Sequence, residues 1–111
     1  MRIAICDDNE IQIDIFMHRI NNFLKRNGDI KALITPYDKG QPLIDDVADG
    51  EWYDIVVLDI VLREENGIEV AKELRSSGYN GNIIFWTAHK EYVFEALDIL
   101  PVHYLIKGSE N

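Results

Sequence analysis

Short apolar runs alternate along this chain with longer segments in which apolar residues recur at helical spacing. This alternation is typical of βαβ units, in which helices connect the parallel strands of one sheet. The run 55–58 is unbroken and has an aspartate at either end, as expected for a strand that is buried on both faces. The pattern therefore predicts an α/β fold with this run at the centre of the sheet.

Periodicity and turn residues divide the chain into five strands and four helices. The expected strands are 3–6, 30–37, 55–58, 83–86 and 102–106. The four expected helices follow Asn9, span 41–48, follow the loop 60–66, and span 91–97. The first helix is expected to turn one apolar stripe toward the sheet, consisting of Ile13, Phe16, Met17, Ile20, Phe23 and Leu24.

The second strand is expected at an edge, because it contains Lys31, Thr35 and Pro36. Crossovers between parallel strands are right-handed, which leaves few possible strand orders. We therefore expect a flavodoxin-like, doubly wound parallel sheet with the strand order 2-1-3-4-5. The length of 111 residues fits one domain, 1–111.

The end of the sequence leaves no room for a fifth helix, since only residues 107–111 follow the last strand. A doubly wound sheet needs cover on both faces. We expect either that the chain is truncated after its fifth strand or that the domain borrows cover from a partner.

The net charge of −9 argues against direct binding of DNA, RNA or an anionic membrane, since those partners require a basic surface. The single cysteine, Cys6, lies in an apolar run and has no partner for an intramolecular disulfide, which suits a reducing compartment. No apolar run approaches the roughly 18 residues of a membrane span. We expect a cytoplasmic protein.

Three carboxylates follow two neighbouring strands of the expected sheet. Asp7 and Asp8 follow the first strand and Asp59 follows the third. Ligands of such sheets bind where the strand order reverses, which is between these two strands. Three close carboxylates need a cation, and oxygen ligands without nearby His or Cys favour Mg²⁺. One carboxylate would remain free to act as a nucleophile toward phosphorus.

The remaining strand ends add complementary groups. Thr87 follows the fourth strand with a hydroxyl, and Lys107 follows the fifth with an ammonium that suits a phosphoryl oxygen. Each of these residues alone is more often an ordinary surface or loop residue. Their joint placement, each at the end of its own strand, indicates a phosphoryl-binding site.

These residues resemble the receiver domains of two-component response regulators. The match consists of Asp7-Asp8, Asp59, Gly67, Thr87-Ala88, Tyr104 and Lys107, in order and at the spacing of the family. The segments around Thr87 and Tyr104 are most similar to receivers linked to LytTR-type DNA-binding domains.

The resemblance implies roles for the site residues. Asp59 would take a phosphoryl group from a sensor histidine kinase, and Lys107 would contact that group. Mg²⁺ would be held by Asp8 and Asp59, by Asp7 mainly through water, and by the backbone carbonyl of Val61.

The resemblance also makes Thr87 and Tyr104 the switch residues: Thr87 would move toward the phosphoryl group, and Tyr104 would rotate inward. Homodimerisation on activation, and contact with DNA only through an output domain absent from this chain, are implied as well.

Two departures from the family pattern keep an alternative open. Gly108 follows the lysine where the family usually has proline, and the loop 61–65 also lacks the usual proline. The alternative is a receiver-like module for dimerisation or protein binding that works without phosphorylation. A Mg²⁺-dependent phosphatase or nuclease is disfavoured by the acid spacing and the charge, and a flavodoxin by the repulsion between Asp7-Asp8 and a phosphate.

Trp86 and the histidines have simpler interpretations. Strand alternation turns Trp86 to the face opposite Thr87, where we expect core packing. His18, His89 and His103 have no metal-ligand spacing and are expected to be ordinary surface or packing residues.

Overall fold

The fold is a parallel five-stranded sheet in the order β2-β1-β3-β4-β5, as the sequence predicts. It is seen in a computed structural model that describes residues 1–28, 30–99 and 102–108. The strands are β1 (Arg2–Cys6), β2 (Leu33–Tyr37), β3 (Ile55–Leu58), β4 (Asn82–Thr87) and β5 (Val102–Ile106). The helices are α1 (Glu10–Arg26), α2 (Gly40–Ala48), α3 (Gly67–Ser76) and α4 (Val93–Ala96), with 3-10 turns η1 (Lys90–Tyr92) and η2 (Leu97–Ile99) on either side of α4.

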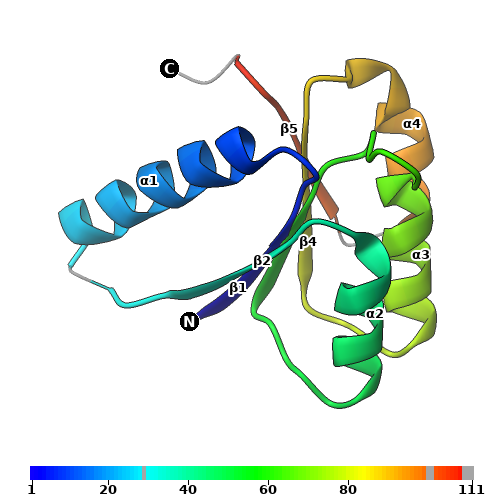
Figure 1. Cartoon of the computed structure of the whole chain (residues 1–111), viewed down its shortest axis with the longest axis horizontal. Helices are drawn as coiled ribbons and strands as arrows, with labels where there is room; N and C mark the ends of the chain where they lie inside the picture. Colours follow the sequence, from blue (N-terminus) through cyan, green and yellow to red (C-terminus); the bar gives the residue numbers. More distant parts are fainter. Residues whose placement is uncertain (29, 100–101, 109–111) are drawn as a thin grey trace.

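The helices lie in two layers around the sheet (Figure 1). Helix α1 covers one face, and α2, α3 and α4 cover the other. β3 is the central strand, and its residues 56–58 are almost completely buried. None of the described helices is both long and apolar enough to cross a lipid bilayer.

Helix α1 begins at the predicted cap. The side-chain oxygen of Asn9 accepts hydrogen bonds from the backbone N–H groups of Ile11 (2.9 Å) and Gln12 (3.4 Å). The predicted stripe is wrong at Phe23, whose side chain is 51% exposed, while Leu24 is buried. Because consecutive helical positions point about 100° apart, the last turn buries Leu24 by turning Phe23 outward.

Two other predicted boundaries are corrected. The second strand begins at Leu33, because its ladder with β1 starts with the pair Arg2–Leu33. The predicted helix 91–97 is divided into η1, α4 and η2. The edge position of β2 is confirmed.

The α1 side of the sheet is incompletely covered near β5. Residues His103 and Leu105 pair with Ile84 and Trp86 of β4 and share their face. Leu105 is 51% exposed there, whereas Trp86 is buried against α1. Among the described helices, α1 alone covers this face, so its cover ends before the β5 edge.

Gly67 allows the closest approach between α3 and the end of β3. A Cβ atom at this position would lie 1.9 Å from the carbonyl oxygen of Asp59 and 2.9 Å from the Cα of Ile60. The Gly67 N–H also donates to the Ile60 carbonyl at 2.7 Å. Only glycine therefore lets α3 start directly behind Asp59.

We predict that Gly67→Ala destabilises the fold by about 3 kcal/mol, because the methyl group must displace backbone rather than a flexible side chain. The measurement is urea unfolding followed by circular dichroism. Alanine ordinarily stabilises a helix relative to glycine, so an unchanged or increased stability would contradict the contact. Glu73→Ala, at an exposed position of the same helix, is the matched control and should change stability little.

Candidate functional site

The ends of β1 and β3 place two aspartates side by side. Cys6 and Leu58 are paired in the sheet, and the Asp59 N–H donates to the Cys6 carbonyl at 3.0 Å. Strand alternation turns Asp7 and Asp59 to the α1 side of the sheet. Asp7 is 1% exposed and Asp59 is 9% exposed, so both carboxylates are largely withdrawn from water.

Lys107 reaches both carboxylates from the end of β5. Its Nζ donates to Oδ2 of Asp7 at 2.7 Å and to Oδ2 of Asp59 at 3.0 Å. The Lys107 side chain is itself only 12% exposed. The fold thus brings together three of the residues that the sequence singles out, although 100 positions separate Asp7 from Lys107.

The second oxygen of each carboxylate is also hydrogen-bonded. Oδ1 of Asp7 accepts from the Asn9 N–H at 3.0 Å, and Oδ1 of Asp59 accepts from the Ile60 N–H at 2.7 Å. Four fixed donor contacts therefore hold the two carboxylates in place, and the backbone of each loop contributes one of them.

Burial and pairing act on the protonation of this cluster. Burial raises the pKa of Asp7, and the hydrogen bonds from Lys107 and Asn9 offset only part of that effect. Burial alone would lower the pKa of Lys107, but the bonds to Asp7 and Asp59 outweigh it and raise that pKa above 10.5. Lys107 is therefore charged at neutral pH, while ionisation of Asp7 is disfavoured relative to water.

Thr87 and Tyr104 meet at the backbone of His89. Thr87 is fully buried, and its Oγ1 accepts a hydrogen bond from the His89 N–H at 3.3 Å. The Tyr104 hydroxyl donates to the His89 carbonyl, and the Tyr104 ring packs against Phe85. The two predicted switch residues are thus joined through one peptide segment of the loop between β4 and η1.

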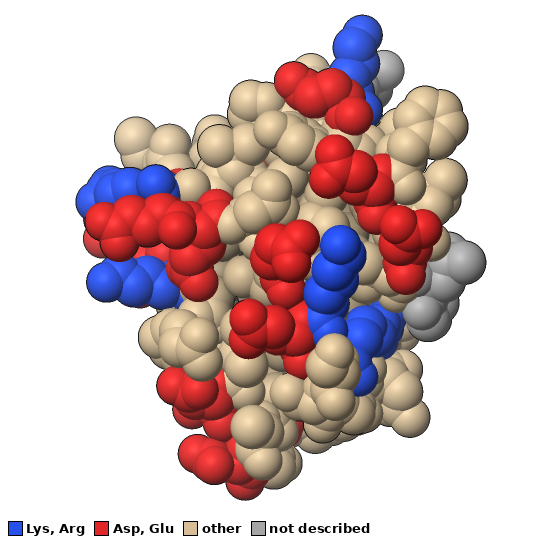
Figure 2. Space-filling view, turned by 90° about the vertical axis from the view of Figure 1, so that its right-hand side faces the viewer, with Lys and Arg blue, Asp and Glu red and all other residues tan. Residues whose placement is uncertain are grey.

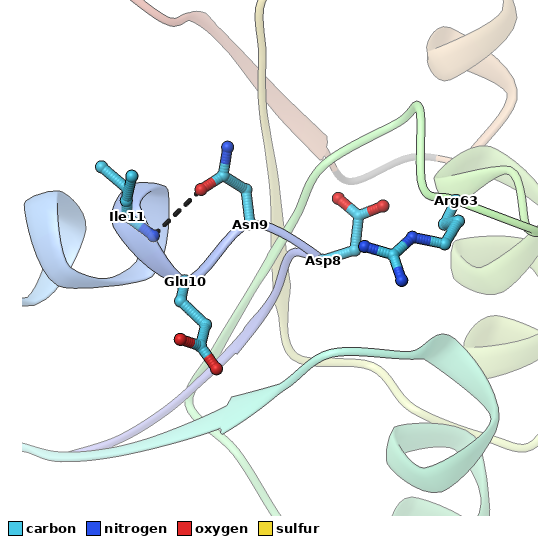
Figure 3. A pocket seen from close by; sticks show the side chains of 5 residues that line it. All are labelled: Asp8, Asn9, Glu10, Ile11 and Arg63. Carbon is cyan, nitrogen blue, oxygen red and sulfur yellow. Dashed lines mark hydrogen bonds between the residues drawn. The ribbon is translucent and has the colours of Figure 1, made fainter.

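Asp8 lines a pocket and is not one of the two carboxylates that pair with Lys107. It lines a pocket of about 440 Å³ together with Asn9, Glu10, Ile11 and Arg63. Figure 3 shows the guanidinium of Arg63 extending toward the Asp8 carboxylate from the loop between β3 and α3. A cation therefore lies in the same pocket as the acidic residues Asp8 and Glu10.

The loop after Asp59 is held in a fixed shape. Val61 and Asn66 form an isolated antiparallel bridge, and Asn66 caps α3 by accepting from the Ile68 N–H at 2.8 Å. Glu65 accepts from the N–H of Gly40 at 2.8 Å and so caps α2, whose own cap residue Lys39 makes no side-chain bond. The bridge to Asn66 thus fixes the backbone of Val61, whose carbonyl is the predicted metal ligand.

The donor chemistry of the site fits Mg²⁺, which prefers oxygen ligands. The buried Asp7 and Asp59 already converge on one cation, the Lys107 ammonium. Within residues 1–28, 30–99 and 102–108, however, no three His, Cys, Asp or Glu side chains gather as a set of metal ligands. The joint use of Asp7, Asp8, Asp59 and the Val61 carbonyl as metal ligands remains a prediction.

Sequence reasoning missed contacts between distant positions. Glu65 caps α2 from 25 residues away, and the sequence contains no local signal for that bond. It also assigned Trp86 to core packing, which its 6% exposure confirms, but did not foresee that Lys107 lies over the Trp86 ring. That contact follows from the alternation of side chains along β4 and β5, which places Trp86 and Lys107 on the same face of the sheet.

Comparisons with known proteins agree with this geometry. The model of the response regulator receiver domain family matches residues 3–111. A sensory transduction protein LytR from Staphylococcus saprophyticus is 29% identical over 114 aligned positions, which cover 100% of this chain and 41% of that protein. A transcriptional regulatory protein LytR from Staphylococcus aureus is 38% identical over 55 positions, covering 50% of this chain and 22% of that protein.

A solved structure has a similar fold. It is the response regulator protein TrrA from Thermotoga maritima in complex with Mg(2+)-BeF, with a TM-score of 0.76 and 25% identity over 98% of this chain and 88% of that chain. The chain spans less than half the length of the two LytR proteins. Because the family model covers almost every residue, the chain belongs to the family of response regulator receiver domains of two-component systems.

Proposed function

We propose that this receiver domain is a phosphorylation-controlled signalling module in which Asp59 accepts a phosphoryl group from a phosphohistidine of a sensor histidine kinase. An oxygen of Asp59 forms a bond to phosphorus while the P–N bond of the phosphohistidine breaks. The electron pair of that bond stays on the imidazole nitrogen. The domain catalyses only its own phosphorylation and dephosphorylation and is otherwise not an enzyme.

The observation that supports this proposal most directly is the ion pair between Lys107 and Asp59 at 3.0 Å. Phosphoryl transfer depends mainly on positioning and on neutralisation of charge. A fixed ammonium beside the nucleophilic carboxylate provides both for the incoming phosphoryl oxygens. The Asp59 side chain keeps 11% of its surface exposed, through which a phosphoryl donor would have to reach it.

Asp8 and Asp59 would hold Mg²⁺, with the Val61 carbonyl as a further ligand and Asp7 acting through water. When bound, Mg²⁺ would neutralise the charge that builds up on the transferring oxygens. Likewise, TrrA was solved in complex with Mg(2+)-BeF. Arg63 lines the same pocket as Asp8 and tunes the entry of a cation.

The switch follows from the bonds that the phosphoryl group offers. It adds about −1.5 to −2 charge and three acceptor oxygens. Thr87 would give up its contact with the His89 N–H and donate its hydroxyl to the phosphoryl group. Because Tyr104 bonds to the same His89 backbone, that movement would release its ring to turn inward. Phosphorylation thereby shifts the population between two packings.

The surface changed by this switch includes α4 and β5, and it is the site proposed for homodimerisation on activation. Phe94 is 81% exposed and Leu97 is 50% exposed on this part of the chain. Large apolar side chains exposed together are typical of interaction surfaces. Dimers that form whether or not the domain is phosphorylated would instead fit the alternative, a module for dimerisation or protein binding that works without phosphorylation.

DNA binding is assigned to an output domain outside this chain, and the controlled output is proposed to be transcription. Figure 2 shows acidic side chains, with some basic ones among them, over the face of α2, α3 and α4. The exposed acidic residues of these helices and of the turns beside them are Asp45, Asp49, Glu69, Glu73, Glu91, Glu95 and Asp98. Such a face repels nucleic acid, whereas a relative is named a transcriptional regulatory protein.

We predict that acetyl phosphate with Mg²⁺ adds one phosphoryl group to the protein, measured as intact mass. Asp59→Asn should abolish the gain, because the amide is a far weaker nucleophile than the carboxylate. Lys107→Ala should slow the gain by at least about tenfold, because the charge facing the phosphoryl oxygens is lost.

Asp14→Asn is the matched control for loss of one negative charge, since Asp14 is an exposed residue of α1. It should accept the phosphoryl group at the rate of the natural sequence. An unmodified mass in the natural sequence, with native circular dichroism, would favour the phosphorylation-independent binding module instead.

The acidic site carries a cost in stability that also supports a functional role. Asp7 is buried beside Asp59, and burial raises its pKa. Above this raised pKa the folded state must keep an ionised carboxylate out of water, which the unfolded state avoids. As the pH falls, folded Asp7 takes up a proton first and the penalty fades. The penalty is absent below pH 3.8, where Asp7 is protonated in both the folded and the unfolded state.

We predict that Asp7→Asn raises the free energy of unfolding at pH 7 by about 1 kcal/mol, a typical gain from relieving such a site. The gain should shrink as the pH is lowered toward 4. Urea unfolding between pH 4 and pH 8 measures both effects. Asp14→Asn should show no comparable gain, and a destabilised Asp7→Asn at neutral pH would contradict the argument.

A further inference from the structure

The Lys107 ammonium lies over the ring of Trp86 as well as between two carboxylates. Its Nζ is 5.3 Å from the centre of the Trp86 ring. Trp86 is only 6% exposed and packs in turn against Phe16 of α1, with the two ring centres 5.5 Å apart. The face of an aromatic ring attracts an ammonium, most strongly where water is excluded. The Lys107 ammonium thus contacts the Trp86 ring in addition to the two carboxylates.

The register of the sheet explains this contact. Trp86 pairs with Leu105 and Thr87 pairs with Ile106, so the next residue, Lys107, returns to the Trp86 face. The Lys107 N–H donates to the Thr87 carbonyl at 2.7 Å, which anchors the start of its side chain. The Thr87 carbonyl thus holds the backbone of Lys107, while its ammonium lies over the Trp86 ring.

The need for such support is specific to this chain. Lysine has a long flexible side chain, and its ammonium is useful only if its position is fixed. Gly108 follows it with φ +80°, and among the described residues other than its chain neighbours no atom lies within 4 Å of the position that a Cβ would occupy. A side chain at position 108 would therefore meet no packing from the described residues.

We infer that Trp86 is a positioning residue, which holds the Lys107 ammonium in place for the phosphoryl group at Asp59. This inference rests on the proposed function only in assigning the phosphoryl contact to Lys107. Trp86 touches neither the phosphoryl group nor the metal in this assignment and acts through the lysine.

The first test compares Trp86→Phe, which keeps an aromatic face, with Trp86→Leu, which keeps apolar volume but loses it. The measurement is the affinity of the full chain for BeF₃⁻ in saturating Mg²⁺, by titration calorimetry. Trp86→Leu should bind about tenfold more weakly and Trp86→Phe within about threefold of the natural sequence. Trp52→Leu, at the other and exposed tryptophan, is the matched control and should change nothing.

The affinity for Mg²⁺ alone separates positioning from general distortion. It should be equal in all four proteins, because Lys107 is not a proposed metal ligand. Three results would overturn the inference. Trp86→Leu could bind BeF₃⁻ as tightly as the natural sequence, or Trp86→Phe could lose as much BeF₃⁻ affinity as Trp86→Leu. The third is that Trp86→Leu loses affinity for Mg²⁺ as well. If Trp86→Leu does not fold, Trp86→Met takes its place with the same expectations.

A second measurement does not depend on phosphoryl binding. The side-chain ammonium of Lys107 should give a resolved ¹⁵N NMR signal in the ligand-free protein, because its hydrogen bonds slow exchange with water. The signal should persist in Trp86→Phe and be lost in Trp86→Leu, and persistence in both would overturn the inference. Failure of the natural sequence to bind BeF₃⁻ would count against the proposed function, while this signal still decides the role of Trp86.

Discussion

The arrangement of the site depends on the ion pair that joins the last strand to the first and third. Lys107 lies 2.7 Å from Asp7 and 3.0 Å from Asp59, in surroundings that exclude most water. Two buried carboxylates without this ammonium would repel each other strongly. The lysine therefore makes the acidic site compatible with a folded protein, and it does so from the position where a phosphoryl group would need a positive charge.

The parallel sheet makes this meeting unavoidable. All five strands run in the same direction, so every residue that follows a strand lies on one rim. Gly67 adds a second constraint, because its lack of a side chain lets α3 pack directly against the Asp59 carbonyl. Asp59 is thus fixed by backbone contacts at its carbonyl and at Oδ1 and by the lysine at Oδ2.

Much of this could be predicted from the sequence, since the relevant signals are local. The unbroken run 55–58, the cap Asn9 and the edge residue Pro36 each predict an element that the structure confirms. The exposure of Phe23 and the bond from Glu65 to α2 could not be predicted. The first depends on which residue of the last helical turn faces the core, and the second on two loops that meet only after folding.

The turn after Lys107 shows how a departure from a family pattern can be compensated elsewhere. Proline, which the family usually has there, fixes φ near −65°, whereas Gly108 has φ +80°. The conformation of this chain is therefore closed to proline, and the position of the lysine must come from other contacts. The Thr87 carbonyl holds its backbone, and the Trp86 ring, backed by Phe16, lies under its ammonium. A rigid aromatic support beneath the side chain thus takes over part of the restraint that a rigid residue after it would provide.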